Sequence, residues 1–167
     1  MSHEEHQSNG PASVGCFVLT VSDTRTPDTD TSGQAIRAML QEAGHAVTGY
    51  TIVRDEPADV ARAVRDGLDM PDTRVVITTG GTGISARDGT FEAVNELFEK
   101  RLDGFGEIFR MLSFQDIGAA AMLSRATAGT IGRSAVFVLP GSEPAVRLAL
   151  SRLVIPELGH IAQQLAK

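Results

Sequence analysis

TTGGTGISARDGT (residues 78–90) separates an apolar, β-branched run from a helical pattern. The run before it, RVVITT (residues 74–79), predicts a buried strand, and TFEAVNELFEK (residues 90–100) predicts a helix. In open parallel sheets, ligands bind outside the carboxyl ends of the strands, where this loop is expected. Its glycines let the backbone approach a ligand, and the N-terminus of the following helix adds partial positive charge. The loop is therefore a candidate anion cradle.

The same order of strand and helix occurs twice before this loop. Residues 14–21 (VGCFVLTV) and residues 45–53 (HAVTGYTIV) are typical of strands. Helices are expected over residues 32–43 and from Pro57 onward, where proline suits the first helical turn. Three strand–helix units with short loops predict a parallel sheet that carries helices on both faces.

The C-terminal half adds at least one more strand. Residues 104–124 look helical, and SAVFVLP (residues 134–140) predicts another buried strand. GTIG (residues 129–132) is interpreted as the turn or the partner of a small hairpin. From Glu143 the chain is expected to be helical, with an interruption at Pro156.

Composition and length limit the class of protein. The 167 residues, 42% of them hydrophobic, correspond to one packed domain. We expect a flexible N-terminal tail at residues 1–13, which are polar and aperiodic, and a single domain at residues 14–167. No apolar run approaches the roughly 20 residues that span a bilayer, and no signal peptide is recognisable. The expected location is cytoplasmic, without a membrane partner.

The net charge of −6 disfavours a nucleic-acid partner, which normally requires a basic face. A phosphate ligand stays compatible with this charge if backbone N–H groups, a few arginines or a bound cation hold it locally. The four histidines show no zinc-ligand spacing. Cys16, the only cysteine, is expected to be a small core residue.

Two known phosphate-binding motifs match the glycine loop poorly. Residues 81–86 fit the dinucleotide fingerprint G-x-G-x-x-A, but the helix begins too late and no strand with a terminal acid follows promptly. A P-loop would need Gly-Lys-Ser/Thr, which this loop lacks. A flexible connector without a ligand is the plainer alternative. The alternation of Thr and Gly at a strand end favours a ligand site.

Two aspartates are expected near this loop. Asp88 lies within it, and Asp55 ends the preceding strand unit. If their strands are adjacent in the sheet, both carboxylates reach one edge, where they would repel a phosphate unless a cation lay between them. This arrangement points to Mg²⁺, which binds oxygen ligands and phosphates together. Alternatively, Asp88 is a helix-start acid and Thr90 is the capping residue.

Several short motifs, taken together, resemble the molybdopterin-binding MoaB/MogA family of molybdenum cofactor biosynthesis. The resemblance covers residues 14–165, nearly everything except the tail. It rests on TVSDT (20–24), RDE (54–56), TTGGTGISARDGTFEA (78–93), GFGEIFRMLSFQDIG (104–118), AMLSRATAG (121–129) and LPGS (139–142). The segment 104–118 looks closer to the MoaB branch than to the MogA branch.

The resemblance implies an α/β fold, a three-layer α/β/α sandwich with a mostly parallel sheet. It also implies adenylylation of molybdopterin by Mg-ATP, the activity of MogA and of its plant and animal relatives, with ATP and molybdopterin as substrates. Asp55 and Asp88 match the two acidic positions tied to catalysis and are the candidate Mg²⁺ ligands. The candidate ligand-binding residues are Ser22, Asp23, Gly80, Gly81, Thr82, Gly83, Ser113, Pro140, Gly141 and Ser142.

One departure from the family pattern concerns the helix start. The family commonly has Thr-Pro-Glu there, whereas this chain has Thr90-Phe91-Glu92. Phe91 lacks the fixed backbone angle that proline brings to a first helical turn, which puts the helix start in doubt but not the acids.

Two other functions fit the same resemblance. One is a molybdopterin-binding or assembly protein without significant catalysis, and the other is a pyrophosphate-cleaving hydrolase of the CinA-like branch. Retention of both acids favours a molybdopterin adenylyltransferase over the binding protein.

A homo-oligomer is expected, because the family forms trimers and MoaB-type members form hexamers from two trimers. Six apolar residues within ten positions give modest support, since one helix face cannot hide them all: Phe105, Ile108, Phe109, Met111, Leu112 and Phe114. The alternative is that all six pack inside the protein's own core.

Overall fold

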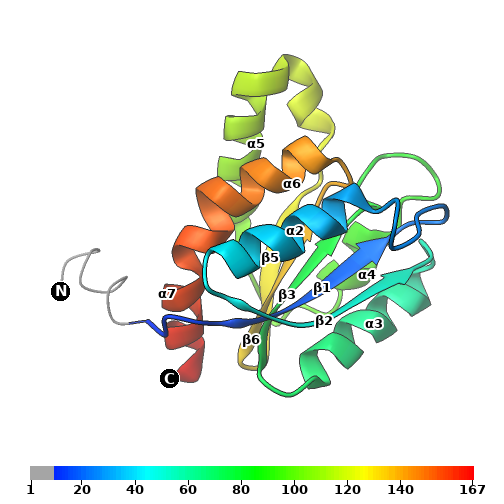
Figure 1. The fold of residues 1–167 in the computed structure, drawn as a ribbon. Coiled ribbons are helices and arrows are strands. Elements are labelled where there is room, and N and C mark those ends of the chain that lie inside the picture. Colours follow the sequence, from blue (N-terminus) through cyan, green and yellow to red (C-terminus); the bar gives the residue numbers. More distant parts are fainter. Residues whose placement is uncertain (1–9) are drawn as a thin grey trace.

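The computed structural model describes residues 10–167, and a six-stranded sheet in the order β2-β1-β3-β6-β5-β4 forms its centre (Figure 1). The strands are β1 (Gly15–Val21), β2 (Ala46–Val53), β3 (Thr73–Thr79), β4 (Lys100–Arg101), β5 (Thr127–Ile131) and β6 (Ser134–Leu139). β2, β1, β3 and β6 run parallel, whereas β5 is antiparallel to both of its neighbours. The predicted mostly parallel sheet is confirmed.

Helices cover both faces of the sheet. One layer contains α2 (Thr31–Glu42), α5 (Asp103–Ile117), α6 (Glu143–Ala149) and α7 (Ile155–Ala166), and the other contains α3 (Pro57–Asp69) and α4 (Thr90–Asn95). Neighbouring residues of β1 point to opposite faces, so that Val18 packs in the first layer and Leu19 in the second. This alternation explains why the central strands are apolar without interruption, and it confirms the three-layer α/β/α sandwich.

Most of the expected N-terminal tail, residues 1–9, lies outside the described residues. Of the remaining tail positions, Gly10 packs against α7, where an added Cβ atom would come within 2.4 Å of the Gly159 carbonyl group. Among residues 10–167, no helix is long and apolar enough to cross a membrane.

The helix expected over residues 90–100 is shorter than predicted. α4 ends at Asn95, and Lys100–Arg101 form β4, which pairs antiparallel with β5. The N–H of Glu99 also donates to the carbonyl of Thr130. Pairing with β5 thus satisfies backbone groups that a longer helix would have bonded internally, and this tertiary contact was not visible in the local pattern.

The C-terminal elements match the prediction closely. β5 and β6 form the expected hairpin, with Gly132 at a φ of 57° in the turn. The final helix is interrupted by a π-helical segment, η2 (Leu150–Val154), and Pro156 falls in the first turn of α7. Because proline has no N–H and clashes with the carbonyl four residues earlier, a wider turn before it keeps the helix continuous.

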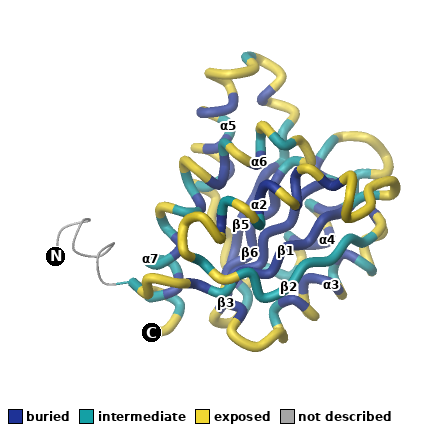
Figure 2. Tube along the Cα trace, viewed as in Figure 1, coloured by how far each residue is buried: buried dark blue, intermediate teal, exposed yellow. Residues whose placement is uncertain are grey.

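α5 projects from the body of the protein and continues into the 3-10 helix η1 (Gly118–Leu123) (Figures 1 and 2). Phe109 and Leu112 are buried in the core, as the alternative to an oligomer required. Phe105 is partly buried and packs against the same core, whereas most other large apolar side chains of this projection are exposed. Those exposed by 45–78% are Ile108, Met111, Phe114, Ile117, Met122 and Leu123.

A buried carboxylate joins α2 to two strands. Asp30 is only 1% exposed, and its Oδ1 accepts the N–H of Gly33 at 2.9 Å, which caps the helix. Its Oδ2 accepts the hydroxyls of Thr20 in β1 and Tyr50 in β2, both at 2.6 Å. Burial, with Asp30 as a further contribution, raises the pKa of Tyr50 to about 12. Asp30 therefore fixes the position of α2 above the ends of β1 and β2.

We expect Asp30→Ala to lower the free energy of unfolding by about 3 kcal/mol, because it removes a helix cap and leaves the buried hydroxyl of Thr20 and the partly buried hydroxyl of Tyr50 without their acceptor. Urea unfolding would measure the loss. Asp28→Ala, an exposed change in the same loop, is the control and should alter stability by about 0.5 kcal/mol or less. Equal stability of the two variants would contradict the assigned role of Asp30.

Candidate active site

Loops at one edge of the sheet contain nearly all the candidate residues. They follow β1, β2, β3 and β6, which are parallel and therefore end at the same edge. The assumption that the strands before Asp55 and Asp88 are adjacent was wrong, because β1 lies between β2 and β3. The two loops still meet, since the N–H of Gly89 donates to Asp55 Oδ1 at 3.2 Å.

The glycine loop reaches Asp55 by passing close to the end of β1. Gly80 has a φ of 101°, and a Cβ atom there would lie 2.2 Å from the Val21 carbonyl oxygen. Gly81 has a φ of 67°, and a Cβ atom there would lie 2.8 Å from Asp55 Oδ2. Both positions require glycine for conformation and for space.

Asp55 is a carboxylate in an unfavourable place for a negative charge. Its side chain lies under the glycine loop, and the residue is only 8% exposed. Burial raises the pKa of Asp55, and the nearby charges of Asp88 and Asp23 raise it further. A site that keeps such a carboxyl group beside two others is a candidate for chemistry or for cation binding.

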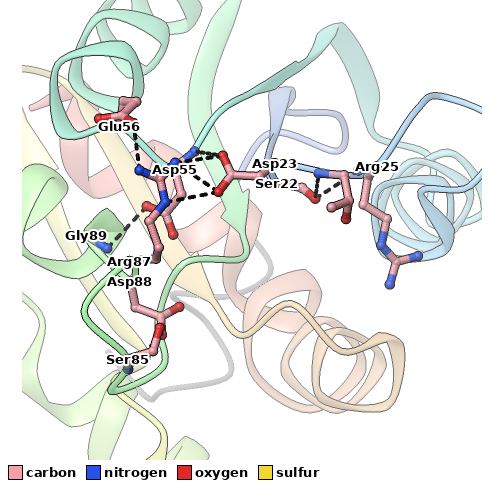
Figure 3. A network of polar contacts seen from close by, with 10 residues as sticks. Ser22, Asp23, Arg25, Asp55, Glu56, Ser85, Arg87, Asp88 and Gly89 are labelled. Carbon is pink, nitrogen blue, oxygen red and sulfur yellow. Dashed lines mark hydrogen bonds and ion pairs between the residues drawn. The ribbon is translucent and has the colours of Figure 1, made fainter.

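Asp88 is held by its own loop. Its Oδ2 accepts the N–H of Ser85 at 2.9 Å and the Ser85 hydroxyl at 2.6 Å (Figure 3). These bonds, with that hydroxyl as the largest cause, lower the pKa of Asp88. The Asp88 carboxylate thus accepts hydrogen bonds from donors of the glycine loop. These donors were expected to bind an external anion instead.

The alternative interpretation, with Asp88 as a helix-start acid and Thr90 as the capping residue, put the start of the helix at the wrong residue. Gly89 is the N-cap of α4 and Thr90 is its first helical residue, so Thr90 is not the capping residue. Thr90 Oγ1 is buried, and no hydrogen-bond partner for it is present among residues 10–167. Asp88 precedes the helix and faces Ser85 rather than the N–H groups of the first turn.

Arg87 joins the loops that follow three different strands. Its guanidinium donates to both carboxylate oxygens of Asp23, at 2.9–3.1 Å, and to Glu56 at 2.7 Å (Figure 3). These contacts lower the pKa of Asp23. Asp23 Oδ1 in turn accepts the N–H of Asp55 at 3.2 Å. The sequence showed Arg87 only as the neighbour of Asp88, and its role as a link between loops was missed.

The loop after β6 is fixed to the same edge. The Thr79 hydroxyl donates to the Pro140 carbonyl at 2.8 Å, and the Ser32 hydroxyl donates to the Gly141 carbonyl at 2.7 Å. Ser142 is the N-cap of α6 through its backbone. The structure therefore brings the predicted residues 140–142 together with the glycine loop.

Two cavities open at this edge and share Ser22 and Arg25. The smaller, of 210 Å³, is lined by residues that include Thr79, Gly80 and Gly141. The larger, of 530 Å³, is lined by Ser22, Asp23, Arg25, Tyr50 and Arg54, among others. The larger cavity lies within the range of about 300–1,000 Å³ that is typical of small-molecule sites, and the smaller one falls below it.

Ser113 is separate from these loops. It lies in α5, where it is 7% exposed. Within the described part of the chain, no hydrogen bond joins it to the other candidate residues. Its assignment as a ligand-binding residue gains no support from the geometry.

The carboxylates available at this edge to hold a magnesium ion that arrives with a substrate are those of Asp55 and Asp88. No group of three or more His, Cys, Asp or Glu side chains within residues 10–167 is arranged to hold a metal ion. Mg²⁺, however, is commonly bound through one or two carboxylates together with waters and substrate phosphates. Asp55 and Asp88, from two loops that touch, can supply those carboxylates.

Known proteins with similar sequences and folds align with nearly the whole chain. A family model described as "Probable molybdopterin binding domain" matches residues 17–160. Molybdenum cofactor biosynthesis protein B of Bacillus cereus is 54% identical over 166 residues, which cover 99% of this chain and 98% of that protein.

Solved structures agree with the sequence match. A crystal structure of a molybdenum cofactor biosynthesis protein B has a TM-score of 0.92 at 53% identity and covers 95% of this chain and 99% of its own. The tungsten cofactor synthesizing protein MoaB from Pyrococcus furiosus has a TM-score of 0.85 at 38% identity, with coverages of 94% and 99%. The resemblance to the MoaB branch is confirmed.

The raised pKa of Asp55 predicts an unusual dependence of stability on pH. A carboxyl group whose pKa is higher in the folded state than its ordinary value of 3.8 stabilises the fold below pH 3.8, and this contribution is lost as pH rises through the folded pKa. Asp55→Asn removes the charge and keeps an acceptor for the Gly89 N–H. Relative to the wild type, the variant should therefore become more stable as pH rises from 4 to 8.

Urea midpoints of both proteins across this pH range test the prediction. Asp66→Asn, an exposed change in α3, serves as the control and should show no such trend. A stability difference between Asp55→Asn and the wild type that does not change with pH would contradict the raised pKa.

Proposed function

The chain belongs to the MoaB/MogA family of molybdenum cofactor biosynthesis, and from this premise we propose that it binds molybdopterin and adenylylates it with Mg-ATP. The observation that carries the proposal is the meeting of Asp55 and the glycine loop at the Gly89 N–H. This contact places two carboxylates beside a loop built for close backbone approach, next to a cavity of suitable size.

The proposed reaction is attack by the terminal phosphate of molybdopterin on the α-phosphorus of ATP. A new P–O bond forms to that phosphorus, the bond to its β-phosphate oxygen breaks, and pyrophosphate leaves. The attacking phosphate is already ionised, so the reaction needs no strong base. Catalysis then depends on alignment and on neutralisation of charge.

Each part of the edge has a role in this proposal. Gly80 and Gly81, which lack side chains, allow the loop to lie close to β1 and Asp55. Arg25 and Arg54 line the larger cavity and can pair with phosphates. Asp55 and Asp88 would hold Mg²⁺, which, when bound, supplies positive charge to the phosphates.

A second candidate function is binding of molybdopterin without catalysis. One observation favours it, namely that the Asp88 carboxylate is engaged by Ser85 within its own loop. Incubation of the protein with ATP, Mg²⁺ and molybdopterin distinguishes the two. Formation of adenylylated molybdopterin supports the enzyme, whereas binding of molybdopterin without product supports the binding protein.

Asp88→Asn should reduce adenylylation by about 10²-fold or more, equivalent to about 3 kcal/mol of transition-state stabilisation, if the charge of Asp88 acts in transfer. The change is isosteric, so stability should fall by about 1 kcal/mol or less. Molybdopterin affinity should change little. Steady-state kinetics and a binding titration measure these effects, with Asp66→Asn as a matched control of normal activity.

Asp55→Asn should act in the same way, and the double variant should lose less than the product of the two single losses if both acids serve one ion. Near-normal turnover in Asp88→Asn would remove its catalytic role and favour the binding protein. A collapse of molybdopterin affinity would make Asp88 a ligand-positioning residue.

We also propose that the protein is a homo-oligomer, a trimer or a hexamer, assembled through the exposed apolar side chains of α5 and η1. Phe114 is 60% exposed and Met122 is 78% exposed on this projection, and large apolar surfaces on soluble proteins commonly mark interfaces. Light scattering should give three or six times 17.7 kDa. Phe114→Glu should lower the mass while circular dichroism shows a folded chain, and a wild-type monomer at micromolar concentration would refute the assembly.

A further inference from the structure

One arginine outside the predicted site holds the glycine loop by its backbone. Arg125 lies just before β5, and its side chain is 27% exposed. Its Nε donates to the Thr82 carbonyl at 3.2 Å, and its Nη2 donates to the carbonyls of Gly83 at 2.7 Å and Asp88 at 3.3 Å. A single guanidinium therefore bonds both ends of the loop segment 82–88.

The same side chain also contacts α4, which follows the loop. Its Nη1 donates to the carboxylate of Glu92, and its guanidinium lies 5.1 Å from the centre of the Phe91 ring. This ion pair lowers the pKa of Glu92. Arg125 is thus fixed in place by the helix while it holds the loop.

The carbonyl contacts determine where the loop's N–H groups point. In a planar trans peptide, the C=O of one residue and the N–H of the next point in opposite directions. The peptide between Asp88 and Gly89 shows this directly. Its carbonyl accepts from Arg125 at 3.3 Å, and its N–H donates to Asp55 at 3.2 Å. Arg125 and Asp55 hold opposite sides of one peptide unit.

The same geometry applies at the other end of the loop. With the carbonyls of Thr82 and Gly83 directed at Arg125, the N–H groups of Gly83 and Ile84 face away from it. The Gly83 backbone is one of the groups that lower the pKa of the Asp88 carboxyl. The N–H of Gly83 is therefore turned toward Asp88.

We infer that Arg125 is a positioning residue, which fixes the glycine loop and, through the N–H groups that bond Asp88 and Asp55, holds these two carboxylates in place for the reaction. This role rests on the proposed adenylylation, but the hold on the loop itself does not. A glycine-rich loop has few side chains of its own to order it, so an external clamp removes backbone freedom before the ligand binds.

The clamp depends on the shape of the guanidinium. Arginine presents five N–H donors in a planar fork, whereas lysine has one ammonium group. Arg125→Lys keeps the charge and can pair with Glu92, but it cannot reach the three carbonyls and the carboxylate together. Arg125→Met keeps most of the aliphatic stem and removes every donor.

Hydrogen exchange tests the hold on the loop without reference to activity. In Arg125→Met, the amides of residues 82–90 should exchange about tenfold faster or more than in the wild type, because local opening becomes easier. Arg147→Met removes an arginine that pairs with Glu143 on α6, and it should leave this segment unchanged. Unaltered exchange of residues 82–90 in Arg125→Met would refute the clamp.

Kinetics test the link to the reaction. Arg125→Met should lower kcat by about tenfold or more, and Arg125→Lys should recover only part of this loss. Because the clamp acts through the loop that carries Asp88, Arg125→Met combined with Asp88→Asn should lose less than the product of the single losses. If the loss in the double variant equals the product of the two single losses, Arg125 has a purely structural role and the inference is overturned. Full activity in Arg125→Lys would also overturn it.

The outcomes separate the two proposals. If the wild type binds molybdopterin but forms no adenylylated product, the proposed function fails, and exchange of residues 82–90 still decides whether the clamp exists. If the wild type is active and Arg125→Met has unchanged kcat, the positioning role fails while the adenylylation stands. Urea midpoints confirm in each case that the variant is folded.

Discussion

The close passage of the glycine loop over the end of β1 is the constraint on which the site depends. β1 lies between β2 and β3, so the loops after those strands can meet only by crossing it. Gly80 allows the crossing, because a Cβ atom there would lie 2.2 Å from the Val21 carbonyl oxygen. Once the loop has crossed, the N–H of Gly89 reaches Asp55 and the carboxylates of two separate loops come together.

The crossing concentrates negative charge, and two arginines compensate for it in different ways. Arg87 bonds carboxylates and so joins the loops after β1 and β2 to the glycine loop. Arg125 bonds mainly carbonyls and so sets the direction of the loop's peptide groups. Of Asp23, Asp55 and Asp88, only Asp55 has a raised pKa, because burial outweighs the hydrogen bond that it receives from Gly89. At neutral pH, the charge of this buried carboxylate is therefore expected to lower the stability of the fold.

The fold was predictable where local patterns decide it, and the site was predictable only in part. Apolar runs identified β1, β3 and β6, and motifs drew attention to Asp55 and Asp88. β4 was missed because it exists only through pairing with β5, and the strand order was missed because periodicity carries no information about neighbours. Arg125 bonds backbone carbonyls 37 to 43 residues away, a contact that no local sequence pattern records.

β4 also determines whether another molecule can add a strand at this edge of the sheet. It is an edge strand of only two residues, and both of them, Lys100 and Arg101, are exposed and basic. Short, charged edge strands discourage the addition of strands from other molecules, which is how natural sheets avoid aggregation. Another copy of the chain therefore cannot readily extend the sheet at this margin. A copy of the chain that added a strand to the sheet would have to do so at the opposite edge, where β2 is four times as long as β4.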